Sequence, residues 1–167
     1  MIKIHQKRLK AVTENMKRRG LPQILVSSTA SVYYLTGLWI EPMERLLVLY
    51  IRDNGECALF GNALFGLTPG GDVPLYIHTD ADDPLTDLAK VVRSGVLGVD
   101  KSWPSCHLLS LMKQRPDVTP KLGSAPVDEA RMLKDEKEIK ALRSASRIND
   151  EVRSEEHTSE LQSRLHL

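Results

Sequence analysis

Hydrophobic residues follow two different spacings along the chain. Helical spacing, first seen at Leu9, Val12 and Met16, alternates with short apolar runs typical of buried strands. Glycine and proline separate most of these segments. We expect helices over residues 3–19, 29–36, 84–94 and 104–115. We expect strands over residues 23–27, 45–51, 57–60, 74–78, 96–100 and 118–122.

This alternation predicts an α/β fold, a mixed β-sheet of about five to six strands flanked by helices. One β-hairpin interrupts the alternation, because Asn54-Gly55 tolerates the positive φ values of a tight turn between two apolar runs. Pro74 cannot donate a backbone hydrogen bond, so the strand over residues 74–78 is expected at a sheet edge. We assign residues 1–130 to this domain.

A charged amphipathic helix is expected to follow, as a connector over residues 131–152. Asp135 and Glu138 have the spacing of a capping box, which predicts a helix start at this point. One apolar stripe then runs along the helix through Ile139, Leu142, Ala145, Ile148 and Val152. Such a stripe needs a partner surface, either the sheet of the same domain or a following domain.

The last segment does not continue this pattern. Residues 153–163 resemble the conceptual translation of a common sequencing-adapter oligonucleotide. We therefore interpret residues 153–167 as a non-native tail and leave them out of the fold prediction. On this hypothesis the natural reading frame continues past Val152 into a catalytic domain that this chain lacks.

Composition excludes several classes of protein. A net charge of +1 offers no excess of cations for a nucleic-acid surface. No apolar run approaches the roughly 20 residues that span a bilayer, and the N-terminus lacks the apolar core of a signal peptide. Cys57 and Cys106 are far apart and have no metal-type spacing, so we expect reduced thiols and a cytoplasmic protein.

The residues alone show no catalytic constellation. The chain has no glycine-rich phosphate loop, no H-E-x-x-H motif and no G-x-S-x-G elbow. Asp80, Asp82 and Asp83 form the only acidic cluster, which we interpret as helix-capping residues. Each histidine outside the tail is isolated in the sequence and is expected to be a surface or packing residue: His5, His78 and His107.

Two motifs carry a resemblance to a known family. Tyr34-Leu35-Thr36-Gly37 and the R-x-L-K-x-x-x-E-I connector over residues 131–139 occur in the order found in the N-terminal domain of the creatinase, prolidase and aminopeptidase P family. The chain resembles this domain over about residues 2–152. The resemblance implies a mixed sheet that precedes a pita-bread catalytic domain.

The resemblance also implies an activity for the whole protein. In the family, two divalent metal ions (manganese, cobalt or zinc) are held by two aspartates, a histidine and two glutamates and activate water for attack on an X-Pro peptide bond. None of these ligands can be assigned to this chain, so we expect no metal or other cofactor in it and no activity from it alone. Two alternatives stay open: a creatinase-like or ectoine-hydrolase-like amidohydrolase, and a stand-alone α/β binding or assembly module.

The resemblance further implies that the loop over residues 38–45 approaches the active site of a neighbouring subunit. Trp39 is the first candidate for a substrate-proximal contact and Arg45 the second, with Tyr34 and Gly37 preceding them at the subunit interface. The alternatives are that Trp39 packs beneath the loop and that Arg45 is a solvated charge at a strand start. The expected partners are the missing catalytic domain, a second copy in a homodimer, and proline-containing peptides, with no nucleic acid and no membrane.

Overall fold

The structure is a computed structural model that describes residues 2–164. The chain divides into two compact units, one ending at Arg131 and the other beginning at Met132. The helices of the first unit are α1 (Gln6–Arg18), α2 (Thr29–Thr36), the 3-10 turn Ala63–Phe65, α3 (Thr86–Val91), α4 (Ser105–Gln114) and α5 (Ala125–Met132). Its strands are β1 (Gln23–Val26), β2 (Leu47–Arg52), β3 (Cys57–Asn62), β4 (Leu75–His78), β5 (Gly95–Val99) and β6 (Val118–Leu122).

The strands form one mixed sheet, as the sequence predicts. Within the described residues it has six strands in the order β4-β3-β2-β1-β5-β6. The β2–β3 hairpin is antiparallel, β2 is also antiparallel to β1, and the other neighbouring pairs are parallel. The strand that begins after Pro74 lies at an edge, which confirms the prediction made from that proline.

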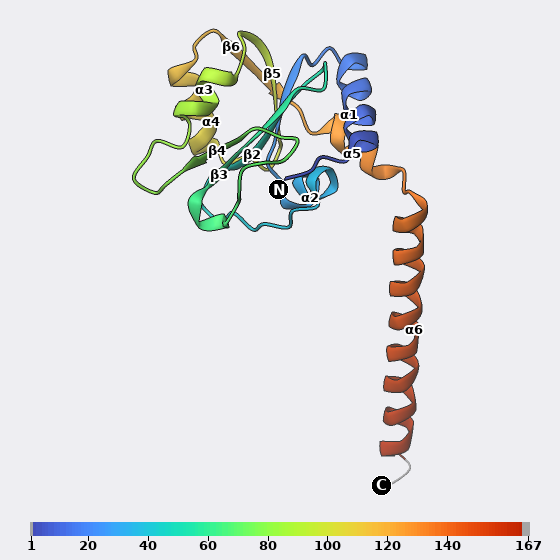
Figure 1. The fold of residues 1–167 in the computed structure, drawn as a ribbon. Coiled ribbons are helices and arrows are strands. Elements are labelled where there is room, and N and C mark those ends of the chain that lie inside the picture. Colours follow the sequence, from blue (N-terminus) through green and yellow to red (C-terminus); the bar gives the residue numbers. More distant parts are fainter. Residues whose placement is uncertain (1, 165–167) are drawn as a thin grey trace. The chain divides into compact units, whose positions relative to one another are not determined.

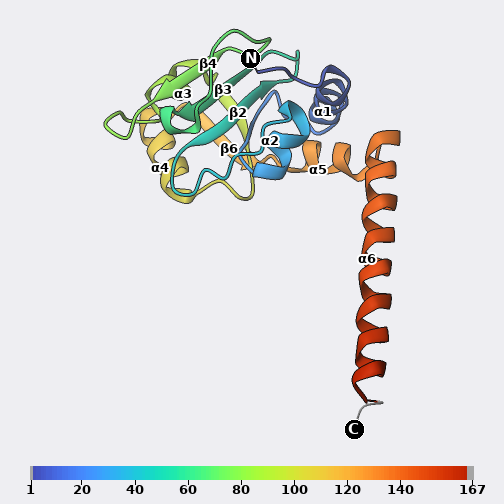
Figure 2. The same ribbon diagram turned by 60° about the horizontal axis from the view of Figure 1, so that its bottom comes forward.

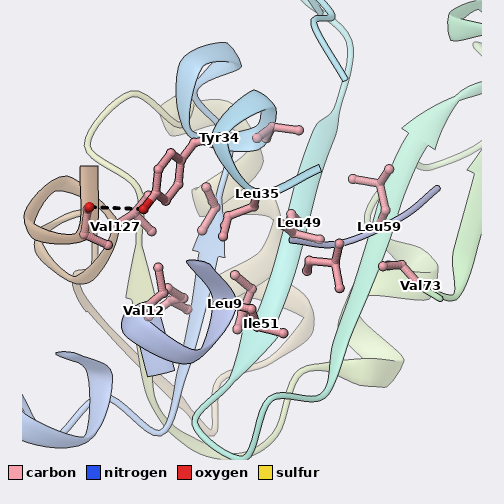
Figure 3. Packing of buried hydrophobic residues seen from close by; sticks show 14 of the residues in the cluster. Leu9, Val12, Tyr34, Leu35, Leu49, Ile51, Leu59, Val73 and Val127 are labelled. Atoms are coloured by element: carbon pink, nitrogen blue, oxygen red, sulfur yellow. Dashed lines mark hydrogen bonds between the residues drawn. The ribbon is translucent and has the colours of Figure 1, made fainter. Parts of the chain in front are cut away.

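Helices cover both faces of the sheet (Figures 1 and 2). Alternate residues of a strand point to opposite faces, so Leu49 and Ile51 pack with α1, α2 and α5, while Val48 and Tyr50 pack with α3 and α4. Figure 3 shows the α1-side face, where Val12 and Leu35, both fully buried, belong to the same cluster as Leu49 and Ile51. The layers therefore form one α/β/α sandwich.

Asp100 ties the carboxyl ends of the two central parallel strands together. It follows β5, is 6% exposed, and accepts hydrogen bonds from the backbone N–H groups of Ser27 and Ser28 after β1, each at 3.0 Å. Its other oxygen accepts bonds from Ser102 N–H (3.2 Å) and from the Ser124 hydroxyl (3.1 Å). Burial opposes ionisation, but these donors outweigh it and lower the pKa of Asp100.

The first helix begins later than the sequence pattern suggests. We expected it from residue 3, whereas α1 starts at Gln6. The preceding residues are extended because their backbone groups bond elsewhere: Ile2 C=O accepts from Asp72 N–H (2.9 Å), and His5 N–H donates to Leu35 C=O (2.8 Å). The N-terminal segment is thus fixed across the domain rather than wound into the helix.

The third helix is shorter than predicted, ending at Val91 instead of at residue 94. Gln23 accounts for this end, because its amide accepts from Arg93 N–H (3.0 Å) and donates to Arg93 C=O (2.7 Å). The helix start also differs, since no side chain caps α3. Asp83 instead closes the turn before it, accepting from Leu85 N–H at 3.0 Å.

Helix α5 is absent from the sequence prediction. The apolar spacing predicts no helix between the last strand and the connector, but Pro126 stands in the first turn of α5, where its missing N–H costs nothing. Ser124 C=O accepts from Val127 N–H (3.1 Å) and Asp128 N–H (3.0 Å). Val127 and Ala130 are buried on the α1-side face, so tertiary packing rather than periodicity determines this helix.

The second unit consists of α6 (Glu136–Arg164). The predicted capping box is confirmed: Asp135 N–H donates to Glu138 Oε2 and Glu138 N–H donates to Asp135 Oδ1, both at 2.9 Å. The helix continues past Val152, the last residue of the predicted connector, into the segment that we left out of the fold prediction. The apolar stripe is largely open, with Leu142, Ile148 and Val152 respectively 56%, 55% and 50% exposed. Across the described residues no helix is long and apolar enough to cross a bilayer.

Candidate functional site

Tyr34 and Gly37 fix the start of the loop that carries the other candidates. Tyr34 is 8% exposed, and its hydroxyl donates to Ala130 C=O at 3.1 Å (Figure 3). The Arg8 guanidinium lies 4.4 Å from the centre of the Tyr34 ring, a cation–π distance. Gly37 ends α2 with φ of 73°, a left-handed conformation that glycine adopts without strain. These two residues therefore hold the loop rather than present side chains to a ligand.

Trp39 stands on the surface just after this turn. Its side chain is 62% exposed and meets Tyr33 edge-to-face, with ring centroids 5.5 Å apart and an interplanar angle of 74°. Tyr33 is itself 47% exposed on α2. Trp39 is thus not packed beneath the loop, and the two rings form one open aromatic surface.

The loop backbone between Trp39 and β2 is held at defined points. Thr29 on α2 donates its hydroxyl to Ile40 C=O at 2.9 Å, and Arg45 N–H donates to Pro42 C=O at 2.9 Å. Met43, between these two anchors, has φ of 53°, which is uncommon for a residue with a side chain. Met43 is also 79% exposed, so the strained turn presents a second apolar side chain to solvent.

Arg45 is held by a carboxylate rather than solvated alone. Its Nε and Nη2 donate to the two oxygens of Asp80 at 3.0 and 2.8 Å, a bidentate pair. Asn62 Nδ2 also donates to Asp80, at 2.7 Å. The hydrogen bond from Arg45 is the largest influence on Asp80 and lowers the pKa of that carboxyl. The helix-capping role predicted for Asp80 is therefore wrong, and β2 starts at Leu47, after Arg45.

A hollow of about 300 Å³ opens beside this pair. Its lining includes Arg45, Asn62, His78, Asp80 and His107. Burial is the largest influence on both histidines and lowers the pKa of each. His107 Nε2 is buried with no hydrogen-bond partner in the part of the chain that the structure describes. The sequence treats these histidines as isolated, but the fold brings them to one hollow, and no spacing rule could have linked β4 to α4.

The described residues do not fit a metal centre. No group of three or more histidine, cysteine, aspartate or glutamate side chains among them is arranged to hold a metal ion. The dinuclear centre that the resemblance implies therefore finds no ligand set in these residues. What the arrangement offers is a binding surface: two open aromatic rings, a fixed loop and a paired guanidinium beside a hollow.

Comparison with known proteins identifies the family and the fold of this domain. Residues 8–133 match the model of the creatinase/prolidase N-terminal domain. A solved dipeptidase from Pyrococcus horikoshii superposes with a TM-score of 0.81 and 28% sequence identity, over 90% of this chain and 44% of that one. A solved prolidase from Thermococcus sibiricus shares the fold, with a TM-score of 0.78 and 23% identity, over 90% of this chain and 43% of that one.

A curated relative points in the same direction. An uncharacterised peptidase of Staphylococcus saprophyticus is 36% identical over 53 residues, which cover 32% of this chain and 15% of that protein. The chain spans less than half the length of the dipeptidase and prolidase that it matches. The family model, however, covers most of this chain, residues 8–133 of 167. The chain therefore belongs to the creatinase/prolidase N-terminal domain family.

Proposed function

We propose that this chain is the non-catalytic N-terminal domain of an Xaa-Pro aminopeptidase or dipeptidase, a metal hydrolase of X-Pro peptide bonds. The observation that carries the proposal is the match to the Pyrococcus horikoshii dipeptidase, at 28% identity and a TM-score of 0.81. The solved neighbours are described as dipeptidases and prolidases, which favours peptides over creatine as substrates. A longer polypeptide would supply the catalytic domain with its two metal ions of manganese, cobalt or zinc.

The proposed role of the site is to cap a substrate pocket in a neighbouring subunit of a homodimer. An indole that is 62% exposed offers a rigid apolar face, which suits the ring of a proline residue. Its edge-to-face contact with Tyr33 restricts its rotation, so little side-chain entropy would be lost on binding. Trp39 would thus exclude water from one side of the substrate.

Arg45 would position the loop from its other end. Its bidentate bond to Asp80 anchors the residue that directly precedes β2. This pairing holds the guanidinium beside the hollow, where it can face a substrate carboxylate. The free thiols of Cys57 and Cys106 are in keeping with the cytoplasmic location that we propose.

The test uses the product of the whole gene. We expect it to hydrolyse leucyl-proline in the presence of Mn²⁺ and to leave leucyl-alanine largely intact. Replacing Trp39 with alanine should lower kcat/KM for leucyl-proline about tenfold, chiefly through KM, because a binding contact is lost. Leu109→Ala is the matched control, since Leu109 is 67% exposed on α4, away from the loop in sequence.

Two results would contradict the proposal. Equal hydrolysis of both dipeptides would exclude proline specificity. An unchanged kcat/KM in the Trp39→Ala variant, with the Leu109→Ala control also unchanged, would remove the capping role from the loop.

A further inference from the structure

A second hollow, of about 480 Å³, lies at the edge of the sheet beside the first residues of β3, which β4 does not cover. Pairing of β3 with β4 starts at Leu59↔Leu75, so Cys57 and Ala58 precede it. Both of these residues line the hollow, together with Pro74 on the chain that leads into β4. Its volume is within the usual range of small-molecule sites, roughly 300–1,000 Å³.

The hollow reaches from one face of the sheet to the other. Leu9 in its lining belongs to the cluster on the α1-side face, against which the Cys57 side chain also packs. Tyr50 in its lining belongs to the cluster on the α3-side face, and Val91, also in the lining, packs against that cluster. A ligand in the hollow would therefore meet apolar side chains on both sides and the open edge of β3 between them.

Opposite charges stand on the two sides. Asp72 lies on the α1 side, where burial and then the Asp72 carboxylate raise the pKa of the Cys57 thiol. Arg93 lies on the α3 side, where burial raises the pKa of Tyr50 and the charge of Arg93 partly offsets that rise. Neither the Asp72 carboxylate nor the Arg93 guanidinium has a hydrogen-bond or ion-pair partner among residues 2–153, whose side chains the structure describes. Arg52, also in the lining, is by contrast paired with Glu56.

The strand edge adds backbone polar groups. Leu59 N–H donates to Pro74 C=O at 2.8 Å, on the β4 side of β3. Alternate residues of a strand direct their backbone groups to the same side, so the N–H and C=O of Cys57 face this side too. Pro74 directly precedes β4. Because proline has no N–H, it cannot donate a hydrogen bond to Cys57 C=O. An extended peptide could use these groups as an added strand does.

We infer that this hollow binds a zwitterionic dipeptide, with its ammonium group toward Asp72, its carboxylate toward Arg93, and its apolar side chains against Leu9 and Val91. A dipeptide suits the site better than a free amino acid because the two charged side chains stand on opposite faces of the sheet, whereas an amino acid carries both charges on one carbon. This binding goes beyond the proposed function and does not depend on it, because every group it uses lies in this chain.

The test is a titration of the full 167-residue chain with leucyl-proline, followed by amide chemical shifts and by calorimetry. We expect saturable binding with shift changes centred on the amides of Cys57 and Ala58. N-acetyl-leucyl-proline amide, which carries neither charge, should bind at least about tenfold more weakly, because two charge-assisted hydrogen bonds are lost. Free leucine should also bind more weakly than the dipeptide.

Variants separate the site from non-specific binding. Asp72→Asn and Arg93→Gln should each weaken leucyl-proline binding about tenfold. Asp150→Asn and Arg143→Gln, on the exposed surface of α6, are matched controls and should leave it unchanged. The inference is overturned if the blocked dipeptide or free leucine binds as tightly as leucyl-proline. It is equally overturned if the Asp72 and Arg93 variants bind like the controls while their amide spectra show an intact fold.

Discussion

Replacing Asp100 with asparagine tests the account of how the domain is held together. The carboxylate joins the ends of β1 and β5, the start of α2 and the segment before α5. One oxygen accepts from Ser27 N–H and Ser28 N–H, and the other accepts from Ser102 and Ser124. Asparagine keeps one acceptor oxygen and places an amide group where the other oxygen stood.

The expected loss follows from counting donors. If the amide nitrogen replaces the oxygen that faces β1, the N–H groups of Ser27 and Ser28 lose their acceptor and face another donor. If it replaces the other oxygen, the N–H of Ser102 does so, while the Ser102 and Ser124 hydroxyls can rotate to accept. In either orientation the hydrogen bonds that remain lose the charge of their acceptor. A hydrogen bond to a charged group contributes roughly 1.5–3 kcal/mol, so we expect a loss of about 3 kcal/mol in the free energy of unfolding. With a urea m-value of roughly 2 kcal/mol/M, the midpoint should fall by about 1.5 M.

Urea unfolding followed by circular dichroism measures this change, with Asp53→Asn as the control. Asp53 lies half-buried in the hairpin turn, and its carboxylate has no hydrogen-bond partner in the described part of the chain. Its replacement should change the free energy of unfolding by no more than about 0.5 kcal/mol. Equal midpoints for the two variants would refute the role assigned to Asp100.

The same carboxylate gives the domain a defined acid sensitivity. The pKa of Asp100 is lower in the folded protein than its unfolded value of about 3.9. Its contribution is therefore complete above about pH 4 and is lost as the pH falls through the folded pKa. The difference in unfolding midpoint between the unsubstituted chain and Asp100→Asn should shrink below about pH 4, and a constant difference down to pH 2 would contradict this assignment.

Three further substitutions test other parts of the structure. Tyr34→Phe removes the hydrogen bond to Ala130 C=O and should lower the free energy of unfolding by about 1 kcal/mol, measured by thermal or urea unfolding. Tyr33→Phe is the control and should change it very little, because the Tyr33 ring is half-exposed. Gly98→Ala should lower the free energy of unfolding by about 1–3 kcal/mol. The added methyl carbon would lie 2.8 Å from Ile24 Cγ2 and 3.0 Å from Gly123 Cα. An unchanged urea midpoint would show that β5 can move aside. Arg45→Gln should leave the urea midpoint nearly unchanged because its ion pair is exposed, and a large fall would mean that the pair holds the fold rather than the loop.

The main elements of the fold could be predicted because local signals agree with tertiary packing. The Asn54-Gly55 turn, the edge position implied by Pro74 and the capping box at Asp135 each depend on the chemistry of a few neighbouring residues. The apolar runs of β1 and β2 could be assigned as strands because they are buried on both faces. The alternation of strands and helices predicted the fold class, the family resemblance implies the same one, and the structure confirms it.

Contacts between distant residues could not be predicted in this way. The bond between Arg45 and Asp80 joins positions 35 residues apart, and that between Asn15 and Pro126 joins positions 111 apart. The end of α3 depends on the Gln23 side chain from β1, a contact without any local signal. The candidate site was therefore predicted only as a loop sequence, while its hollow and its histidines required the fold.

Our central proposal is that this chain is one domain of a longer Xaa-Pro peptidase. Sequencing the genomic DNA across the codon for Val152 tests it most directly. We predict an open reading frame that departs from residues 153–167 and encodes a second domain with two aspartates, a histidine and two glutamates as metal ligands. A native stop codon at this point, or a continuation that lacks those five ligands, would contradict the account.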